Sequence, residues 1–122
     1  MDTKKLTDKE EEVMRIFWER GPITVREAVE AFPEPRPHFN TVSTYVHILE
    51  TKGYLQREKR PGAMVYAPAI PIERYQKASV KVMLKRLFNG NSRSLVSALV
   101  EEEEISVDEL KELIEIVSRQ KL

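Results

Sequence analysis

The spacing of apolar residues predicts three helices in the first half of the chain. Apolar positions recur at helical intervals behind Thr7, again over 24–32, and again over 39–52. Glycine or proline follows each of these segments, and both residue types end helices. A proline-rich connector separates the second segment from the third, so the pattern predicts three separate short helices.

Three of the expected helix starts carry a capping box, in which Ser or Thr is followed three residues later by Glu. The hydroxyl and the carboxylate then satisfy backbone N–H groups that the first helical turn leaves without partners. Such pairs mark the residues at which helices begin. They are Thr7 with Glu10, Thr24 with Glu27, and Ser106 with Glu109.

After Gly53 the pattern changes from a helical period to an alternating one. Residues 54–58 and 64–67 are typical of two short strands, joined by a turn that contains Pro61 and Gly62. The helical period then returns in three segments, 72–88, 92–103 and 107–120.

Three helices followed by a β-hairpin form the element order of a winged helix-turn-helix. We therefore expect a mainly α fold with a small β-hairpin wing. Residues 1–70 would form a winged-helix DNA-binding domain, and residues 71–122 a three-helix dimerisation domain. Within the first domain, 24–32 and 39–52 would be the two helices of the motif, and the second of them the recognition helix.

The composition excludes several classes of protein. The chain has 122 residues, 41% hydrophobic and 33% charged, which suits a folded protein of one or two small domains. It has no cysteine, which excludes disulfides, thiolate metal sites and cysteine nucleophiles. His38 and His47 have no clustered carboxylates at ligand spacing, so we expect no metal, no cofactor and no enzymatic activity. Because no apolar run approaches the length of a membrane span, we expect a soluble, cytoplasmic protein without direct membrane insertion.

The net charge of zero conceals blocks of opposite sign. Residues 7–34 hold four basic and eight acidic side chains, and residues 94–122 hold three and eight. Residues 36–60 hold five and two, and residues 71–93 hold six and one. A basic middle suits contact with an anion such as DNA, while the acidic flanks repel it. Solvated helix faces with chance clustering are the alternative.

The expected recognition helix carries small hydrogen-bonding side chains on one face. Its inward face would be formed by Val42, Tyr45, Val46 and Leu49. The opposite face offers Asn, Ser and Thr, which read base edges in the major groove but are poor helix formers. The presence of poor helix formers at these positions, despite their cost in helix stability, favours a role in contacting DNA. A plain solvent-exposed face is the alternative. The predicted base contacts are Asn40, Thr41, Ser43, Thr44 and His47.

Basic side chains gather at the expected wing. Arg57, Lys59 and Arg60 flank its turn, where they would contact phosphates beside the groove that the helix occupies. His38, at the start of the third helix, is a further candidate for backbone contact. A charged edge strand that prevents sheet-to-sheet association is the alternative explanation for the wing cations.

The three C-terminal segments carry apolar stripes that a single chain is too short to bury completely. So short a chain segment buries too small a fraction of its surface to form a stable core alone. Pairing two copies would solve this and would present two recognition helices to two half-sites. Packing of this tail on its own N-terminal domain is the alternative. The predicted interface residues are Leu87, Phe88, Leu95, Leu99, Leu110, Leu113, Ile114 and Val117.

Four segments carry a resemblance to a known family. They are LTDKEEEVMRIFWERGPITVREAVEAF, NTVSTYVHILETKGYL, VYAPAIPIERY and NGNSRSLVSALVEEEEISVDELKELIEIV. Together they span nearly the whole chain, and they resemble the penicillinase-repressor (BlaI/MecI/CopY) transcriptional regulators. The resemblance implies a winged helix followed by a three-helix dimerisation domain, and a repressor that binds a palindromic DNA operator as a homodimer.

The resemblance also bears on base preference and on the inducing signal. Ile48 stands where the antibiotic-resistance repressors often have a basic residue, so a different base preference is expected. Family repressors of β-lactam resistance are cut at an Asn-Phe bond, and the aligned bond here is Ala98-Leu99, a departure from that site. The absence of cysteine excludes the copper-responsive mode. Relief of repression by proteolysis, or by a partner such as a membrane sensor protease, is what the resemblance implies.

Two other classes of function compete with the repressor. A winged-helix module that joins proteins and does not bind DNA is favoured by the overall neutrality and by the acidic first helix. The short polar helix face and the basic wing favour DNA instead. An enzyme is a distant third, because the sequence offers no catalytic triad, paired carboxylates or glycine-rich phosphate loop.

Overall fold

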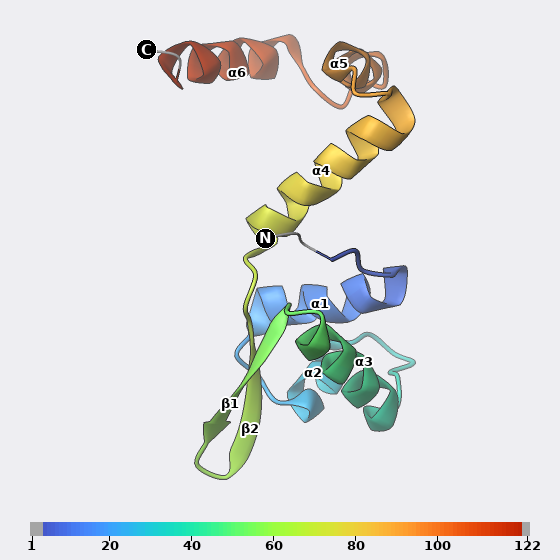
Figure 1. The fold of residues 1–122 in the computed structure, drawn as a ribbon, viewed down its shortest axis with the longest axis vertical. Helices are drawn as coiled ribbons and strands as arrows, with labels where there is room; N and C mark the ends of the chain where they lie inside the picture. The colour runs from blue at the N-terminus through green and yellow to red at the C-terminus, as the bar shows by residue number, and fades with distance from the viewer. Residues whose placement is uncertain (1–3, 121–122) are drawn as a thin grey trace. The chain divides into compact units, whose positions relative to one another are not determined.

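The computed structural model describes residues 4–120, which fold as two compact units divided between Ala78 and Ser79. This division falls inside the helix Ile72–Phe88 (α4), later in the chain than the domain boundary that the sequence predicted after residue 70. The predicted boundary stays a prediction. Figure 1 shows α1, α2 and α3 grouped together, with the tip of the β1–β2 hairpin extending away from them. The elements are α1 (Asp8–Arg20), α2 (Val25–Ala31), α3 (Phe39–Thr51), β1 (Leu55–Arg60), β2 (Ala63–Pro68), α4 (Ile72–Phe88), α5 (Ser92–Glu101) and α6 (Val107–Gln120).

The capping boxes form where the sequence predicts them. At the start of α1, the Thr7 hydroxyl accepts a hydrogen bond from the Glu10 backbone N–H at 3.2 Å, and the Glu10 carboxylate accepts one from the Thr7 N–H at 3.0 Å. Thr24 caps α2 in the same way with Glu27. Gly53, which follows α3, has φ of +85°, a left-handed conformation that glycine adopts without strain.

The hairpin has longer strands and a tighter turn than the sequence predicted. The antiparallel ladder runs from the pair Leu55 and Pro68 to the pair Arg60 and Ala63, which leaves two residues in the loop. Proline fixes its own φ near −65°, and Gly62 has φ of +77°. This is the combination that a type II turn requires. Because the turn needs only Pro61 and Gly62, the flanking residues Lys59, Arg60 and Ala63, which were expected in the turn, belong to the strands.

One hydrophobic core holds the first unit together. It joins the inward faces of the three helices to the base of the hairpin, and Tyr66 of β2 also pairs through its backbone with Ile23, just after α1. The core residues are Leu6, Val13, Met14, Ile16, Phe17, Ile23, Ala28, Val42, Val46, Leu49, Tyr54, Leu55, Tyr66 and Ile70.

The first turns of α4 belong to this first unit. The Trp18 indole N–H donates to the carbonyl oxygen of Ile70 at 2.9 Å, and the Tyr75 hydroxyl donates to the Glu11 carboxylate at 2.7 Å. The Tyr75 ring lies 5.2 Å from that of Trp18 and 5.8 Å from that of Tyr54, measured between centroids. Aromatic contact and hydrogen bonds therefore fix the beginning of α4 on α1.

The second unit contains the rest of α4 together with α5 and α6, and no side chain of these three helices is buried. Asn91 caps α5, and the third predicted capping box forms between Ser106 and Glu109. The sequence predicted that the middle helix reaches residue 103, but α5 ends at Glu101. Glu103 has φ of +58°, and consecutive carboxylates oppose the negative end of a helix dipole, which explains the earlier end. No helix among the described residues is both long and apolar enough to cross a membrane.

Candidate nucleic-acid interface

Helix α3 has one buried face and one exposed polar face, as its residue pattern predicts. Val42, Val46 and Leu49 are almost completely buried, whereas Tyr45 is half-buried. The five residues predicted to contact bases lie away from this core: Asn40, Thr41, Thr44 and His47 are exposed, and Ser43 is half-buried. The structure thus brings these five side chains onto one helix, on the surface of the first unit.

The hydroxyl groups on this face are partly oriented by the helix itself. The Thr44 hydroxyl donates to the carbonyl oxygen of Asn40 at 2.9 Å, and the Thr51 hydroxyl donates to that of His47 at 3.0 Å. A threonine hydroxyl has one proton and two lone pairs. Because the proton of Thr44 is committed to the backbone, this side chain offers an outside ligand an acceptor oxygen and a methyl group.

His38 occupies the N-cap position of α3. Its side chain makes no capping hydrogen bond and is exposed. The amide groups of the first helical turn carry partial positive charge. The next residue, Phe39, is 47% exposed, so this end of the helix is open to solvent. The predicted contact of His38 with a phosphate therefore has an accessible donor at the positive end of the helix.

The three wing cations differ in what surrounds them. Lys59 and Arg60 are exposed near the turn, where an Arg60 nitrogen lies 3.5 Å from the Glu58 carboxylate. Arg57 instead donates two hydrogen bonds to Glu50 of α3, from Nε and from Nη2, each at 2.8 Å. All three side chains reach solvent, since Arg57 is 51% exposed and Arg60 48%, but the guanidinium of Arg57 is paired with Glu50 through both of these nitrogens.

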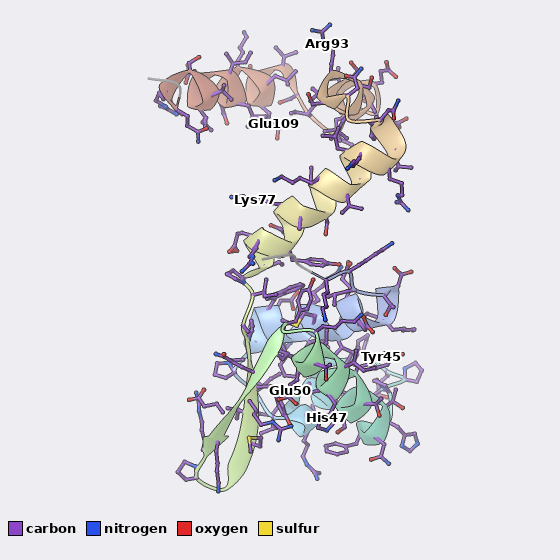
Figure 2. The ribbon with its side chains drawn as sticks, viewed as in Figure 1. Tyr45, His47, Glu50, Lys77, Arg93 and Glu109 are labelled. Atoms are coloured by element: carbon purple, nitrogen blue, oxygen red, sulfur yellow. The ribbon has the colours of Figure 1, made fainter. Side chains whose placement is uncertain are left out.

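Glu50 is the acidic centre of this surface. Figure 2 shows it on the hairpin side of α3, with Tyr45 on the other side of the helix. Its side chain is 18% exposed, and His47 Nδ1 lies 3.4 Å from its Oε1. The hydrogen bonds and the positive charge of Arg57 outweigh burial and lower the pKa of Glu50 below its ordinary value. Among the described residues there is no group of three or more side chains that could hold a metal ion.

Sequence reasoning missed Glu50 and Tyr66 as parts of this site. The sequence analysis included Glu50 only as one of the two acidic residues in the basic segment 36–60, and Tyr66 only as a residue of the second strand. In the structure the guanidinium of Arg57 lies between them, 5.9 Å from the centroid of the Tyr66 ring. Arg57 and Tyr66 are cross-strand partners, but the distance between α3 and β1 depends on tertiary packing, so no local signal predicts the Glu50 contact.

The residues predicted to form a dimer interface all lie in the second unit with apolar surface uncovered. Phe88, Leu95 and Leu110 are half-buried. The remaining five are exposed to 62% for Leu87, 39% for Leu99, 48% for Leu113, 63% for Ile114 and 50% for Val117.

Comparison with known proteins gives matches along nearly the whole chain. A family model described as Penicillinase repressor matches residues 6–119. The penicillinase repressor of Bacillus licheniformis is 28% identical over 118 residues, which are 96% of this chain and 92% of that protein. The methicillin resistance regulatory protein MecI of Mammaliicoccus sciuri is 27% identical over 122 residues, 98% of this chain and 99% of that protein.

One solved structure relates the fold to a nucleic-acid complex. It is the solution structure of the monomeric form of Bacillus licheniformis BlaI in complex with the blaP half-operator. The superposition has a TM-score of 0.52 at 27% sequence identity and covers 61% of this chain and 92% of that chain. The likeness confirms the predicted fold class: N-terminal helices with a hairpin wing, followed by C-terminal helices.

Proposed function

Because the chain belongs to the penicillinase repressor family, we propose that it is a dimeric transcriptional repressor that binds a palindromic DNA operator. Members of this family are transcription regulators rather than enzymes, as the composition predicted. In the proposed complex, α3 enters the major groove of each half-site and the hairpin lies against the neighbouring phosphates.

The observation that carries the proposal is the exposed polar face of α3. Its Asn and Thr side chains are small and exposed, and its Ser side chain is half-buried. Asn40 suits bidentate pairing with adenine, and the acceptor oxygen of Thr44 suits an amino group of adenine or cytosine. His47 would extend the readout toward the wing.

Two further observations support DNA as the partner. The Bacillus licheniformis relative was solved on a half-operator, and its likeness to this chain includes the fold on which the polar face lies. Lys59 and Arg60 of the hairpin and His38 at the start of α3 offer further accessible donors. Phosphate contacts from these residues would set the register of α3 in the groove without themselves reading sequence.

The uncovered helices of the second unit support pairing of two copies. A folded monomer rarely leaves so many large apolar side chains exposed. Covering them against the same surface of a second chain would bury the predicted interface, from Leu87 in α4 to Val117 in α6, around a two-fold axis. The same axis would match the symmetry of a palindromic operator.

We further propose that repression is relieved by proteolysis or by a sensor partner that acts on the second unit. The bond between Ala98 and Leu99 lies inside α5, with Ala98 half-buried and Leu99 39% exposed. A peptide bond held in a helix must unfold locally before a protease can cleave it. Cutting there would separate α6 from the rest of the interface and weaken the dimer.

The test is fluorescence anisotropy of the full chain with a duplex from upstream of its own operon and with a scrambled duplex, each at two salt concentrations. The proposal expects tight binding to the upstream duplex alone, which weakens with salt and saturates at two chains per site. Equal and weak binding to both duplexes would reduce the interaction to electrostatic attraction. Absence of binding at low salt would overturn the repressor and favour a protein-interaction module.

A further inference from the structure

Arg57 differs from the other wing cations because its guanidinium is committed to another element. Nε and Nη2 donate to the two carboxylate oxygens of Glu50, each at 2.8 Å. This bidentate geometry is the strongest planar pairing that arginine makes with a carboxylate. Among the described residues, Lys59 has no ion pair, and Arg60 has a single contact with Glu58 at 3.5 Å.

The pair lies near the end of the part of the hairpin that packs on the rest of the unit. At the base of the hairpin, Leu55, Val65 and Tyr66 are buried. Residues 56–64, which include Arg57 and the turn, are all exposed. Arg57 lies opposite Tyr66 in the ladder, one position before the pair of Glu58 with the buried Val65. Its contact with Glu50 therefore joins α3 to the hairpin on the exposed strand, close to where the buried part of the hairpin ends.

The Tyr66 side of the pair is itself held firmly. The Tyr66 backbone exchanges hydrogen bonds with Ile23 at 2.8 and 3.2 Å, and its ring packs edge-on against Phe17 with centroids 6.5 Å apart. The guanidinium of Arg57 therefore contacts a fixed aromatic ring and a carboxylate that is 18% exposed, although the Arg57 side chain itself is 51% exposed. A side chain held on both sides in this way controls the direction of the strand that carries it.

We propose that Glu50 and Arg57 are positioning residues: their pairing fixes the wing against the recognition helix and withholds the Arg57 charge from DNA phosphates. This inference rests on the proposed DNA-binding function and replaces a phosphate contact of Arg57 with an internal one. Its consequence is selectivity, because a cation that is neutralised internally adds nothing to sequence-independent attraction, while the fixed wing still favours the correct register.

The salt dependence of binding separates the two roles of Arg57. Each phosphate contact contributes about −0.9 to the slope of log K against log salt for duplex DNA. A phosphate contact tolerates lysine, which acts as a point charge, whereas a bidentate fork does not. A positioning arginine therefore predicts loss of affinity in Arg57→Lys with no change of slope.

The experiment measures the full chain by anisotropy across a salt series, with the upstream and scrambled duplexes. Arg57→Lys and Arg57→Ala are expected to weaken binding to the upstream duplex about threefold to tenfold with the slope unchanged. The matched control Lys59→Ala should make the slope shallower by about 0.9. Glu50→Gln should release Arg57, make the slope steeper by about 0.9 and lower the ratio of upstream to scrambled affinity.

Folding of each variant is checked by the fluorescence of Trp18, the single tryptophan of the chain, which packs inside the first unit. A shallower slope in Arg57→Ala, equal to that of Lys59→Ala, would overturn the inference and make Arg57 a phosphate ligand. Unchanged affinity and slope in both Arg57 variants and Glu50→Gln would overturn it too. An unsubstituted chain that failed to distinguish the two duplexes would overturn the proposed function, and this inference with it.

Discussion

Lys52, which caps the C-terminal end of α3, donates a hydrogen bond from Nζ to the Glu10 carboxylate in the first turn of α1. The two residues are 42 positions apart in the sequence. Glu10 is 8% exposed and also accepts from the backbone N–H of Thr7. One carboxylate thus caps α1 and ties it to the end of the proposed recognition helix.

Loss of the lysine should destabilise the first unit. Lys52→Met leaves the buried carboxylate of Glu10 without its charged donor, and we expect a loss of about 1–3 kcal/mol in the free energy of unfolding. Urea denaturation followed by Trp18 fluorescence measures this. The matched control is Lys9→Met, because Lys9 is exposed and lies 3.6 Å from an exposed Glu12; its cost should stay below about 0.5 kcal/mol. Equal effects would show that Glu10 does not need Lys52.

The same carboxyl group should contribute to the acid sensitivity of the fold. Burial opposes ionisation of Glu10, but the hydrogen bonds from Lys52 and Thr7 prevail, and the pKa of Glu10 is lowered. The folded state therefore binds this proton less tightly than the unfolded state. The stabilisation is complete above the ordinary glutamate pKa of about 4.3 and is lost as the pH falls through the lower folded value.

A pH series of unfolding free energies in the unsubstituted chain and in Glu10→Gln measures this contribution. The difference between the two proteins should be largest near neutral pH and should shrink as the pH falls below the ordinary glutamate pKa of about 4.3. A difference that stayed constant over this range would mean that the ionised form of Glu10 has no special role.

Substitutions on the polar face of α3 should separate base reading from backbone attraction. Asn40→Ala, or Thr44→Val, which keeps the shape of the side chain and removes its hydroxyl, should cost about 1–3 kcal/mol of discrimination between upstream and scrambled duplexes. Arg60→Ala should weaken binding to both duplexes alike. Anisotropy titrations measure both effects. Unchanged discrimination in Asn40→Ala and Thr44→Val would remove α3 as the reading element.

Charge in the apolar stripe of α6 should separate the two chains of the proposed dimer. Leu113→Asp would place a carboxylate in the interface, and we expect the dissociation constant of the dimer to rise at least about 10-fold. Sedimentation equilibrium measures this constant. Glu112→Gln is the control, because this neighbouring residue is exposed on the acidic side of the helix. A monomeric unsubstituted chain would contradict the dimer directly.

Local chemistry predicted most of the fold, and the reason is visible in the caps and turns. Thr7, Thr24 and Ser106 each fix a helix start through a partner three residues away. Gly53 ends α3 through its own backbone preference. These signals act within one turn of chain, so they can be found in the sequence without knowledge of tertiary packing.

The parts that could not be predicted depend on distances between elements. Arg57 carries the same charge as Lys59 and Arg60 and lies beside them in the sequence, yet only Arg57 reaches Glu50. Residue type and spacing predicted a basic wing, but the placement of β1 against α3 decides which of its cations pairs with Glu50. The contact of Lys52 with Glu10 arises in the same way.

The uncovered helices of the second unit have a consequence for gene dosage under the proposed pairing. A chain that covers its C-terminal apolar faces only in a pair exists mainly as monomers when it is scarce. By mass action the number of pairs then varies with the square of the number of chains, so removing half of the chains removes about three-quarters of the pairs. A promoter controlled in this way would respond to a modest loss of repressor with a disproportionate rise in transcription.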